Sequence, residues 1–236
     1  MIIYLPWQTQ SIYFLQELFS FIPDGAWQRI TNLGYTNVAL LLGITLIYHR
    51  GARAVLALFL NAIIVVIATI SIKGWLNFSR PPVLLDHDRL NIIGDELCCN
   101  SFPSGHSTSV AVFCSLIFLT TKNIYMRSGA LLFALTVGLS RIMVGAHWPQ
   151  DVIAGFLLGS LVTFVLFPFF SNMLAKFFPT FGISVTPIYR WIIFGLLALL
   201  WASSFLNVDI VITSILAIFC LPAWWLTTSN KINKTS

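Results

Sequence analysis

The chain has 236 residues, of which 58% are hydrophobic and only 9% carry a charged side chain. Soluble globular domains contain about 25% charged residues, so this composition excludes a soluble protein and indicates a membrane protein. The thirteen Lys and Arg residues give a formal net charge of +5. They lie scattered at the ends of hydrophobic runs without a basic stripe, so we expect no nucleic-acid partner. The length favours one integral-membrane domain over residues 1–236.

The first apolar segment, SIYFLQELFSFI at residues 11–22, is short for a membrane span. It contains Glu17 and stops at a Pro-Asp-Gly turn, whereas a helix needs roughly 20 apolar residues to cross the hydrocarbon. We therefore expect residues 1–31 to form an N-terminal segment with a short interfacial or re-entrant helix. A full span over about residues 12–27 is the alternative.

Longer hydrophobic runs predict an all-α, polytopic transmembrane helix bundle of about six to seven spans. The runs cover residues 32–48, 54–72, 107–121, 128–144, 152–170, 191–206 and 210–226. The first five runs make up a predicted core over residues 32–171. The last two form an additional C-terminal segment over residues 189–227, which matches no motif that we can interpret.

Basic residues near the ends of these spans predict the orientation. If the spans alternate in direction, most basic residues fall on one side, namely Arg50, Arg53, Lys122, Arg127, Lys176, Arg190, Lys231 and Lys234. Cytoplasmic loops carry an excess of Lys and Arg, so this side should face the cytoplasm of a bacterial inner membrane. Lys73, Arg80, Arg89 and Arg141 fall on the opposite, periplasmic side. Basic residues kept on this disfavoured side indicate a function there.

Three short polar segments are predicted to meet on that periplasmic side. They are KGWLNFSRPP at residues 73–82, SFPSGHS at residues 101–107 and SRIMVGAHWPQD at residues 140–151. Predicted spans two to five all enter or leave the same face of the membrane next to these segments. Topology therefore predicts one site built from all three.

The cations of these segments suit a phosphate group. Lys73, Arg80 and Arg141 supply three positive charges, and a guanidinium matches two phosphate oxygens at once. Ser104 and Gly105 lead into a helix, whose free backbone N–H groups and positive end bind anions. Gly105 also lets a ligand approach the backbone closely.

Two histidines and one aspartate supply reactive groups for the same site. One imidazole can attack phosphorus while the other protonates the leaving oxygen, and His147 and His106 are the candidates. Asp151 follows His147 by four residues, near the first turn of a predicted helix that begins at Pro149. Its carboxylate could orient the His147 imidazole and stabilise the positive charge that develops on it.

We expect no metal ion and no other cofactor, because the cations and the helix end already neutralise a phosphate. The loop between Arg80 and Pro103 contains the acidic residues Asp86, Asp88, Asp95 and Glu96. A divalent-ion site there is the alternative, but the loop lacks a calcium-loop spacing and is favoured as a solvated acidic loop. The adjacent Cys98 and Cys99 are not expected to form a disulfide, because their ring would be strained.

The pattern K-x6-R-P, then P-S-G-H, then S-R-x5-H-x3-D resembles the three-part signature of the type 2 phosphatidic acid phosphatase superfamily. It runs from Lys73 to Asp151, with every signature position present. The resemblance implies that His147 is a nucleophile that forms a phosphohistidine, that Asp151 orients it and that His106 is the general acid. It implies phosphate binding by Lys73, Arg80, Ser104, Gly105 and Arg141. It also implies catalysis without a metal.

These observations predict an integral-membrane lipid phosphatase whose substrate stays in the bilayer. The substrate would be a phosphomonoester or diphosphate of a lipid, with undecaprenyl diphosphate the leading candidate. Phosphatidylglycerophosphate, phosphatidate and a lipid A phosphate are further candidates. The oligomeric state cannot be predicted from the sequence.

Two other functions use the same residues. A lipid phosphotransferase would pass the phosphoryl group from the phosphohistidine to another lipid instead of water. A non-hydrolysing carrier would use the cations for binding alone, but binding does not explain two histidines and an aspartate, and the chain shows no internal repeat typical of a transporter.

Overall fold

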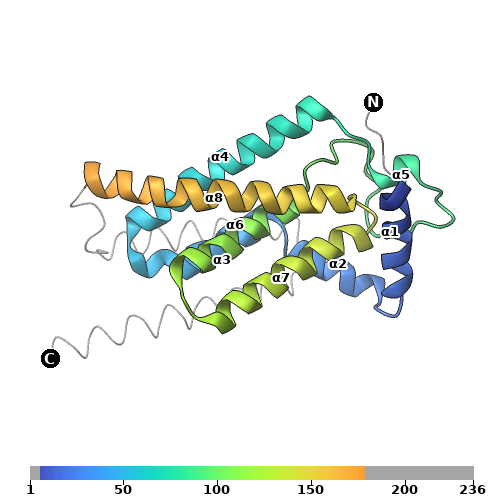
Figure 1. The fold of residues 1–236 in the computed structure, drawn as a ribbon, viewed down its shortest axis with the longest axis horizontal. Coiled ribbons are helices and arrows are strands. Elements are labelled where there is room, and N and C mark those ends of the chain that lie inside the picture. Colours follow the sequence, from blue (N-terminus) through green and yellow to red (C-terminus); the bar gives the residue numbers. More distant parts are fainter. Residues whose placement is uncertain (1–5, 179–236) are drawn as a thin grey trace.

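The computed structural model describes residues 6–178, and every regular element within this range is a helix (Figure 1). The elements are α1 (Pro6–Leu18), α2 (Asp24–Asn32), α3 (Thr36–Ile47), the 3₁₀ turn η1 (Tyr48–Arg50), α4 (Ala52–Leu76), α5 (Pro81–Leu84), α6 (Gly105–Thr120), α7 (Ile124–Met143) and α8 (Pro149–Phe177). The expected all-α class is confirmed for the described residues. The two additional spans predicted within residues 189–227 lie outside them.

Helix α6 packs against α8, α7 and α3 and so lies at the centre of the bundle (Figure 1). Its contact with α8 depends on two glycines of α8. A Cβ atom at Gly155 would overlap the carbonyl oxygen of Ser104, and one at Gly159 would overlap that of Thr108. Glycine at both positions therefore lets the two helices approach closely, as small residues do in membrane bundles.

Three of the described helices are long and apolar enough to cross a membrane. They are α7, α8, and α4 with its continuation to Leu84. Large apolar side chains on these helices point outward, for example Ile67 on α4, Leu132 on α7 and Leu161 on α8, each more than half exposed. Water would disfavour such a surface, whereas lipid chains are as apolar as these side chains. The outer surface of the bundle therefore fits the interior of a bilayer.

The N-terminal segment contains two helices in place of the one short helix expected there. Helix α1 lies across one end of the bundle (Figure 1) and ends at Leu18, and α2 begins at Asp24. Residues 12–27 therefore do not form one continuous helix. Helices α2 and α3 together have the length and composition of one span, bent by 56°. The hydrophobic run at residues 32–48 thus corresponds to α3 and η1, which follow α2 after this bend.

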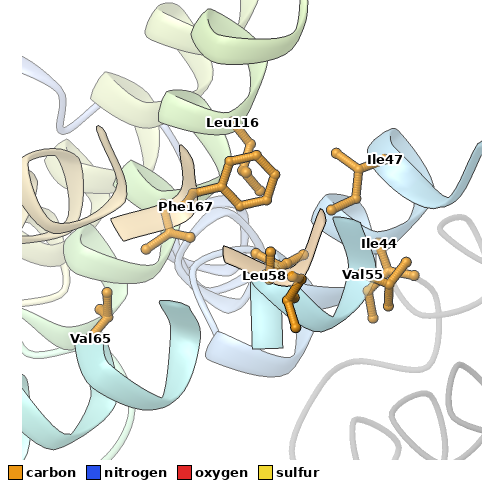
Figure 2. Close-up of a cluster of buried hydrophobic side chains, with 10 residues drawn as sticks. Ile44, Ile47, Val55, Leu58, Val65, Leu116 and Phe167 are labelled. Atoms are coloured by element: carbon orange, nitrogen blue, oxygen red, sulfur yellow. The ribbon is translucent and has the colours of Figure 1, made fainter. Parts of the chain in front are cut away.

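A cluster of buried apolar side chains holds four helices together in the half of the bundle farther from the N-terminal ends of α6 and α8 (Figure 2). Its labelled members come from α3, α4, α6 and α8 and are Ile44, Ile47, Val55, Leu58, Val65, Leu116 and Phe167. Close packing gives such a cluster its dispersion energy. A hydrogen bond of 3.1 Å from Asn61 Nδ2 on α4 to Thr163 Oγ1 on α8 adds a fully buried polar contact. By fixing this half of the bundle, these contacts also fix the relative positions of α4, α6 and α8 at the other end, where α6 and α8 begin.

Candidate active site

The three polar segments lie at one end of the bundle, where α4 and α7 end and α6 and α8 begin (Figure 1). Hydrogen bonds connect each pair of segments: Lys73 Nζ donates to Ser101 O at 3.3 Å, Arg80 Nη1 to Ala146 O at 2.9 Å, and Ser104 N to Asp151 O at 2.9 Å. The convergence expected from the topology is therefore present in the structure.

The turn between α7 and α8 places His147 inside this site. Gly145 adopts φ of 72°, a left-handed conformation that favours glycine, and a Cβ atom there would lie 2.8 Å from Asn91 O. After this turn, the backbone N–H of His147 donates to Arg141 O at 3.2 Å. Pro149 then begins α8. The imidazole of His147 is consequently buried, with 2% of the residue exposed.

Asp151 lies in the first turn of α8, where its carboxylate oxygen Oδ2 is close to three donors. The backbone N–H of Trp148 donates to it at 3.0 Å, the Ser101 hydroxyl donates at 2.5 Å, and His147 Nδ1 lies 3.4 Å away. Asp151 and Ser101 have no exposed surface. Backbone and hydroxyl donors thus fix the carboxylate beside Nδ1 of His147.

The hydrogen bonds of His147 indicate which of its ring nitrogens carries the proton. Arg80 Nη1 lies 3.3 Å from His147 Nε2, and a guanidinium can only donate. Nε2 is therefore the unprotonated nitrogen, whose lone pair accepts this hydrogen bond, and Nδ1 carries the proton toward Asp151. This tautomer is the one that a nucleophilic Nε2 requires.

The surroundings of His147 also favour its neutral form. Burial, followed by the positive charges of Arg141, Arg80 and Lys73, lowers the pKa of the His147 imidazole well below its usual range. A group with a lowered pKa stays unprotonated at neutral pH. His147 is therefore neutral where it would act as a nucleophile.

The three predicted phosphate-binding cations are held mainly by backbone carbonyl groups. Arg80 Nε donates to Cys99 O at 2.8 Å, and Lys73 Nζ donates to Asn100 O at 2.6 Å. Arg141 is 7% exposed, and its Nη1 donates to Thr31 Oγ1 at 2.5 Å. Neutral partners keep these cations in place without cancelling their charge, so the site retains a positive field that suits an anion.

The N-terminal end of α6 carries Ser104, Gly105 and His106. Ser104 has no exposed surface, and its hydroxyl accepts from Ser107 N at 3.4 Å and Ser107 Oγ at 3.0 Å, so it caps the helix. No atom lies within 4 Å of the place where a Cβ of Gly105 would be. His106 is partly exposed and lies within electrostatic reach of Arg141, Arg80 and Lys73. The first turn of α6 is therefore open to a ligand at Gly105, whereas phosphate binding by the Ser104 hydroxyl stays a prediction.

Two polar residues at the site were not identified from the sequence. Ser101 donates to the carboxylate of Asp151, and Thr31 accepts from Arg141. Ser101 precedes the PSGH motif by two residues, so its position close to a motif was a usable signal. Thr31 lies outside every motif segment, and nothing in the local sequence indicates that it reaches Arg141.

The acidic loop forms local contacts in the structure. His87 Nε2 lies 3.5 Å from Glu96 Oε1, and Asp86 Oδ1 accepts from Asp88 N at 3.1 Å. Within residues 6–178, no three His, Cys, Asp or Glu side chains gather as possible metal ligands. Cys98 and Cys99 form a disulfide, so the expectation that they stay unpaired was wrong. Their carbonyl groups accept hydrogen bonds from Arg80, which explains why this loop stays close to the cations.

The family model described as the PAP2 superfamily matches residues 50–175. These residues include all three motif segments. The match therefore covers more than half of the chain and the whole of the predicted motif.

Curated relatives match shorter stretches. The chain is 37% identical over 89 residues to an undecaprenyl-diphosphatase of Sulfolobus acidocaldarius, covering 38% of this chain and 39% of that protein. It is 44% identical over 70 residues to a lipid A 1-phosphatase of Rhizobium johnstonii, covering 28% of each. The chain thus spans less than half the length of these two relatives.

The fold is also similar to a solved structure, the crystal structure of Aquifex aeolicus LpxE. The TM-score is 0.63 at 24% sequence identity, and the match covers 71% of this chain and 99% of that one. At this identity the likeness concerns the fold alone.

Proposed function

Because this chain belongs to the PAP2 superfamily, we propose that it is an integral-membrane phosphatase that hydrolyses a phosphomonoester or diphosphate of a lipid. The observation that carries this proposal is the position of His147. Its Nε2 lies 3.3 Å from Arg80 Nη1, and its Nδ1 lies 3.4 Å from Asp151 Oδ2. A neutral imidazole between a phosphate-binding cation and an orienting carboxylate suits nucleophilic attack on phosphorus.

In the first step, the lone pair of His147 Nε2 attacks the phosphorus atom. The bond between phosphorus and the leaving oxygen breaks, and a phosphohistidine forms. His106, at the open end of α6, donates a proton to the leaving oxygen. Burial and the positive charges of Arg141, Arg80 and Lys73 lower the pKa of the His106 imidazole, and the negative charge of a bound phosphate offsets these cations and favours the protonated form. Asp151 stabilises the positive charge that develops on the His147 ring, and Arg80, Arg141 and Lys73 stabilise the phosphoryl oxygens.

In the second step, a water molecule attacks the phosphorus of the phosphohistidine. His106, which has lost its proton in the first step, accepts a proton from this water. The bond from phosphorus to Nε2 breaks, and inorganic phosphate leaves. His106 is thereby protonated again, and the enzyme returns to its starting state.

The substrate class follows from where the site lies. Its groups lie at the end of a bundle whose outer surface fits a bilayer, so a lipid can keep its hydrocarbon chain in the membrane while its phosphate reaches the cations. Undecaprenyl diphosphate is the leading substrate, and the similarity to an undecaprenyl-diphosphatase supports it. The similarity to a lipid A 1-phosphatase supports a lipid A phosphate as the second candidate. Phosphatidylglycerophosphate and phosphatidate are the remaining two candidate substrates.

The test is phosphate release from the four lipids by the purified full chain in detergent, with EDTA present. We expect wild-type protein to hydrolyse at least one lipid and His147→Ala to lose at least about 1,000-fold in kcat, because the nucleophile is gone. His49→Ala is the matched control, since His49 is exposed on η1 at the other end of the bundle. Inactivity of the wild type on all four lipids, or full activity of His147→Ala, would overturn the proposal.

The phosphotransferase alternative differs only in what attacks the phosphohistidine. Incubation with a phosphorylated donor lipid and a second, unphosphorylated lipid separates the two functions by mass spectrometry. Hydrolysis predicts free phosphate and no gain of mass by the second lipid. A carrier would bind the lipids and leave the phosphate on all of them.

A further inference from the structure

The bend between α2 and α3 brings a short segment, residues 31–35, against the candidate active site. This segment, called the elbow here, joins the end of α2 to the start of α3 at the 56° bend. It lies outside residues 50–175, which match the family model. It contains none of the motif residues, so the function proposed above assigns it no role.

Thr31, at one end of the elbow, holds a predicted phosphate-binding residue. Its Oγ1 accepts a hydrogen bond of 2.5 Å from Arg141 Nη1, and Thr31 is 4% exposed. Nε of Arg141 is buried without a partner among the described residues. The Thr31 hydroxyl is therefore an important determinant of the direction in which the Arg141 guanidinium points.

The other end of the elbow lies against His106. A Cβ atom at Gly34 would lie 2.8 Å from the His106 Cβ, so only glycine lets the chain pass this close. The ring of Tyr35 lies 4.8 Å from that of His106 between centroids, tilted by 51°. Tyr35 is partly exposed and lies within electrostatic reach of Arg141. Tyr35 therefore places an aromatic ring beside the proposed general acid.

We propose that the elbow completes the active site, with Thr31 as a positioning residue that aims Arg141 at the phosphate and Tyr35 as a specificity residue that contacts the lipid on the leaving-group side. The inference rests on the proposed function, because it takes Arg141 as a phosphate ligand and His106 as the acid. It extends that function to a part of the chain outside the family match.

The first experiment measures binding of inorganic phosphate to the full chain in detergent by titration calorimetry. Thr31→Val has nearly the same shape as threonine but no hydroxyl, so we expect about tenfold weaker binding, because a hydrogen bond from a charged group is lost. Thr31→Ser keeps the hydroxyl and should bind as the wild type does. Thr136→Val is the control, since the exposed Thr136 hydroxyl bonds only its own helix, at Leu132 O.

The second experiment measures binding of a long-chain alkyl phosphonate, which has a carbon in place of the bridging oxygen and cannot be hydrolysed there. Tyr35→Ala should bind this lipid about fivefold more weakly, because an aromatic contact is lost, but should bind inorganic phosphate as the wild type does. Tyr35→Phe should retain binding of both. Tyr125→Ala is the control, because Tyr125 is 86% exposed at the start of α7, at the other end of the bundle.

The pattern of losses decides the proposal. A role in local packing alone would weaken the binding of both ligands equally in Tyr35→Ala, and this result would overturn the specificity role. Wild-type phosphate affinity in Thr31→Val, or no phosphate binding by the wild type, would overturn the positioning role. Neither measurement needs turnover, so if no lipid is hydrolysed the proposed function fails while these two tests still decide the role of the elbow.

Discussion

Asp151 illustrates how single residues at this site depend on buried partners. A buried carboxylate is costly unless hydrogen bonds compensate for the lost water. Trp148 N and the Ser101 hydroxyl both donate to Oδ2, so the carboxylate is held before any substrate arrives. Its spacing from His147 was sufficient to predict the pair. The motif draws attention to Ser101, but its partner Asp151 is 50 residues away in the chain, so the hydrogen bond between them was not predictable from the sequence.

Ser101→Ala tests this dependence. Without the hydroxyl, Asp151 loses a donor and can shift away from Nδ1 of His147, which lies 3.4 Å away. We expect kcat to fall about tenfold with little change in KM, because in the proposed mechanism the His147–Asp151 pair stabilises charge in the transition state and does not bind the ground state. The measurement is steady-state hydrolysis of the best lipid substrate.

Ser115→Ala provides the control for this variant. Ser115 is a buried serine, 2% exposed, deep in α6. It should keep wild-type kcat. Wild-type kcat in Ser101→Ala would contradict a positioning role for the hydroxyl, and an increase in KM alone would assign Ser101 to substrate binding.

At the scale of the elements, the broken span α2–α3 is the main departure from the sequence-based expectation. Hydropathy detects the apolar run at residues 32–48 but not the direction of the helix axis. At the break, Gly34 passes close to His106 and Val137, a tertiary contact that hydropathy does not detect. Helices α4 and α7 begin and end within four residues of the predicted runs, whereas α8 continues seven residues beyond its run, to Phe177.

Gly34→Ala tests the contact at the break. The added methyl group would lie 2.8 Å from atoms of His106 and of Val137, so one of these side chains has to shift. We expect lipid hydrolysis to fall at least about tenfold, because displacement of a proton donor by an ångström can cost that much or more. Hydrolysis rate and elution volume in detergent are the two measurements.

The control is Gly129→Ala on α7, where no atom lies within 4 Å of the added Cβ. It should keep both activity and elution volume. An active Gly34→Ala protein would show that the elbow is free to move away from His106. A Gly34→Ala protein that fails to assemble would be recognised by a changed elution volume. In that case Gly34→Ser should show a loss of activity together with the same change of elution volume.

At the scale of the whole molecule, the two ends of the bundle differ in their use of basic residues. Arg80 and Arg141 lie inside the candidate site, whereas Arg50, on η1, and Arg127, near the start of α7, lie at the other end of the bundle. There Arg50 Nη2 donates to Thr120 O at 2.7 Å and Arg127 Nη2 to Phe118 O at 2.9 Å, where α6 ends. Arg53, Lys122 and Lys176 lie at the same end as Arg50 and Arg127. Cytoplasmic loops carry an excess of Lys and Arg, so this end suits the cytoplasmic face. We therefore propose that the site faces the periplasm.

Labelling of single cysteines tests this orientation. In a background with all four cysteines changed to serine, Asp88→Cys marks the site end and Lys122→Cys marks the other end, and both positions are exposed. We expect a membrane-impermeant maleimide to label Asp88→Cys in intact spheroplasts and Lys122→Cys only after lysis. The reverse pattern would place the site in the cytoplasm and would also exclude a substrate in the outer leaflet.

The sequence by itself determined the helical membrane class, the three motif segments and the candidate reactive residues, because hydropathy and residue spacing are local properties of the chain. It also determined that these segments share one end of the bundle, because alternating spans leave no other arrangement. Only the tertiary structure decided that Ser101 and Thr31 join the site and that the bend between α2 and α3 lies against His106. The physical reason is that these contacts join residues far apart in the chain, whose approach depends on how the helices pack.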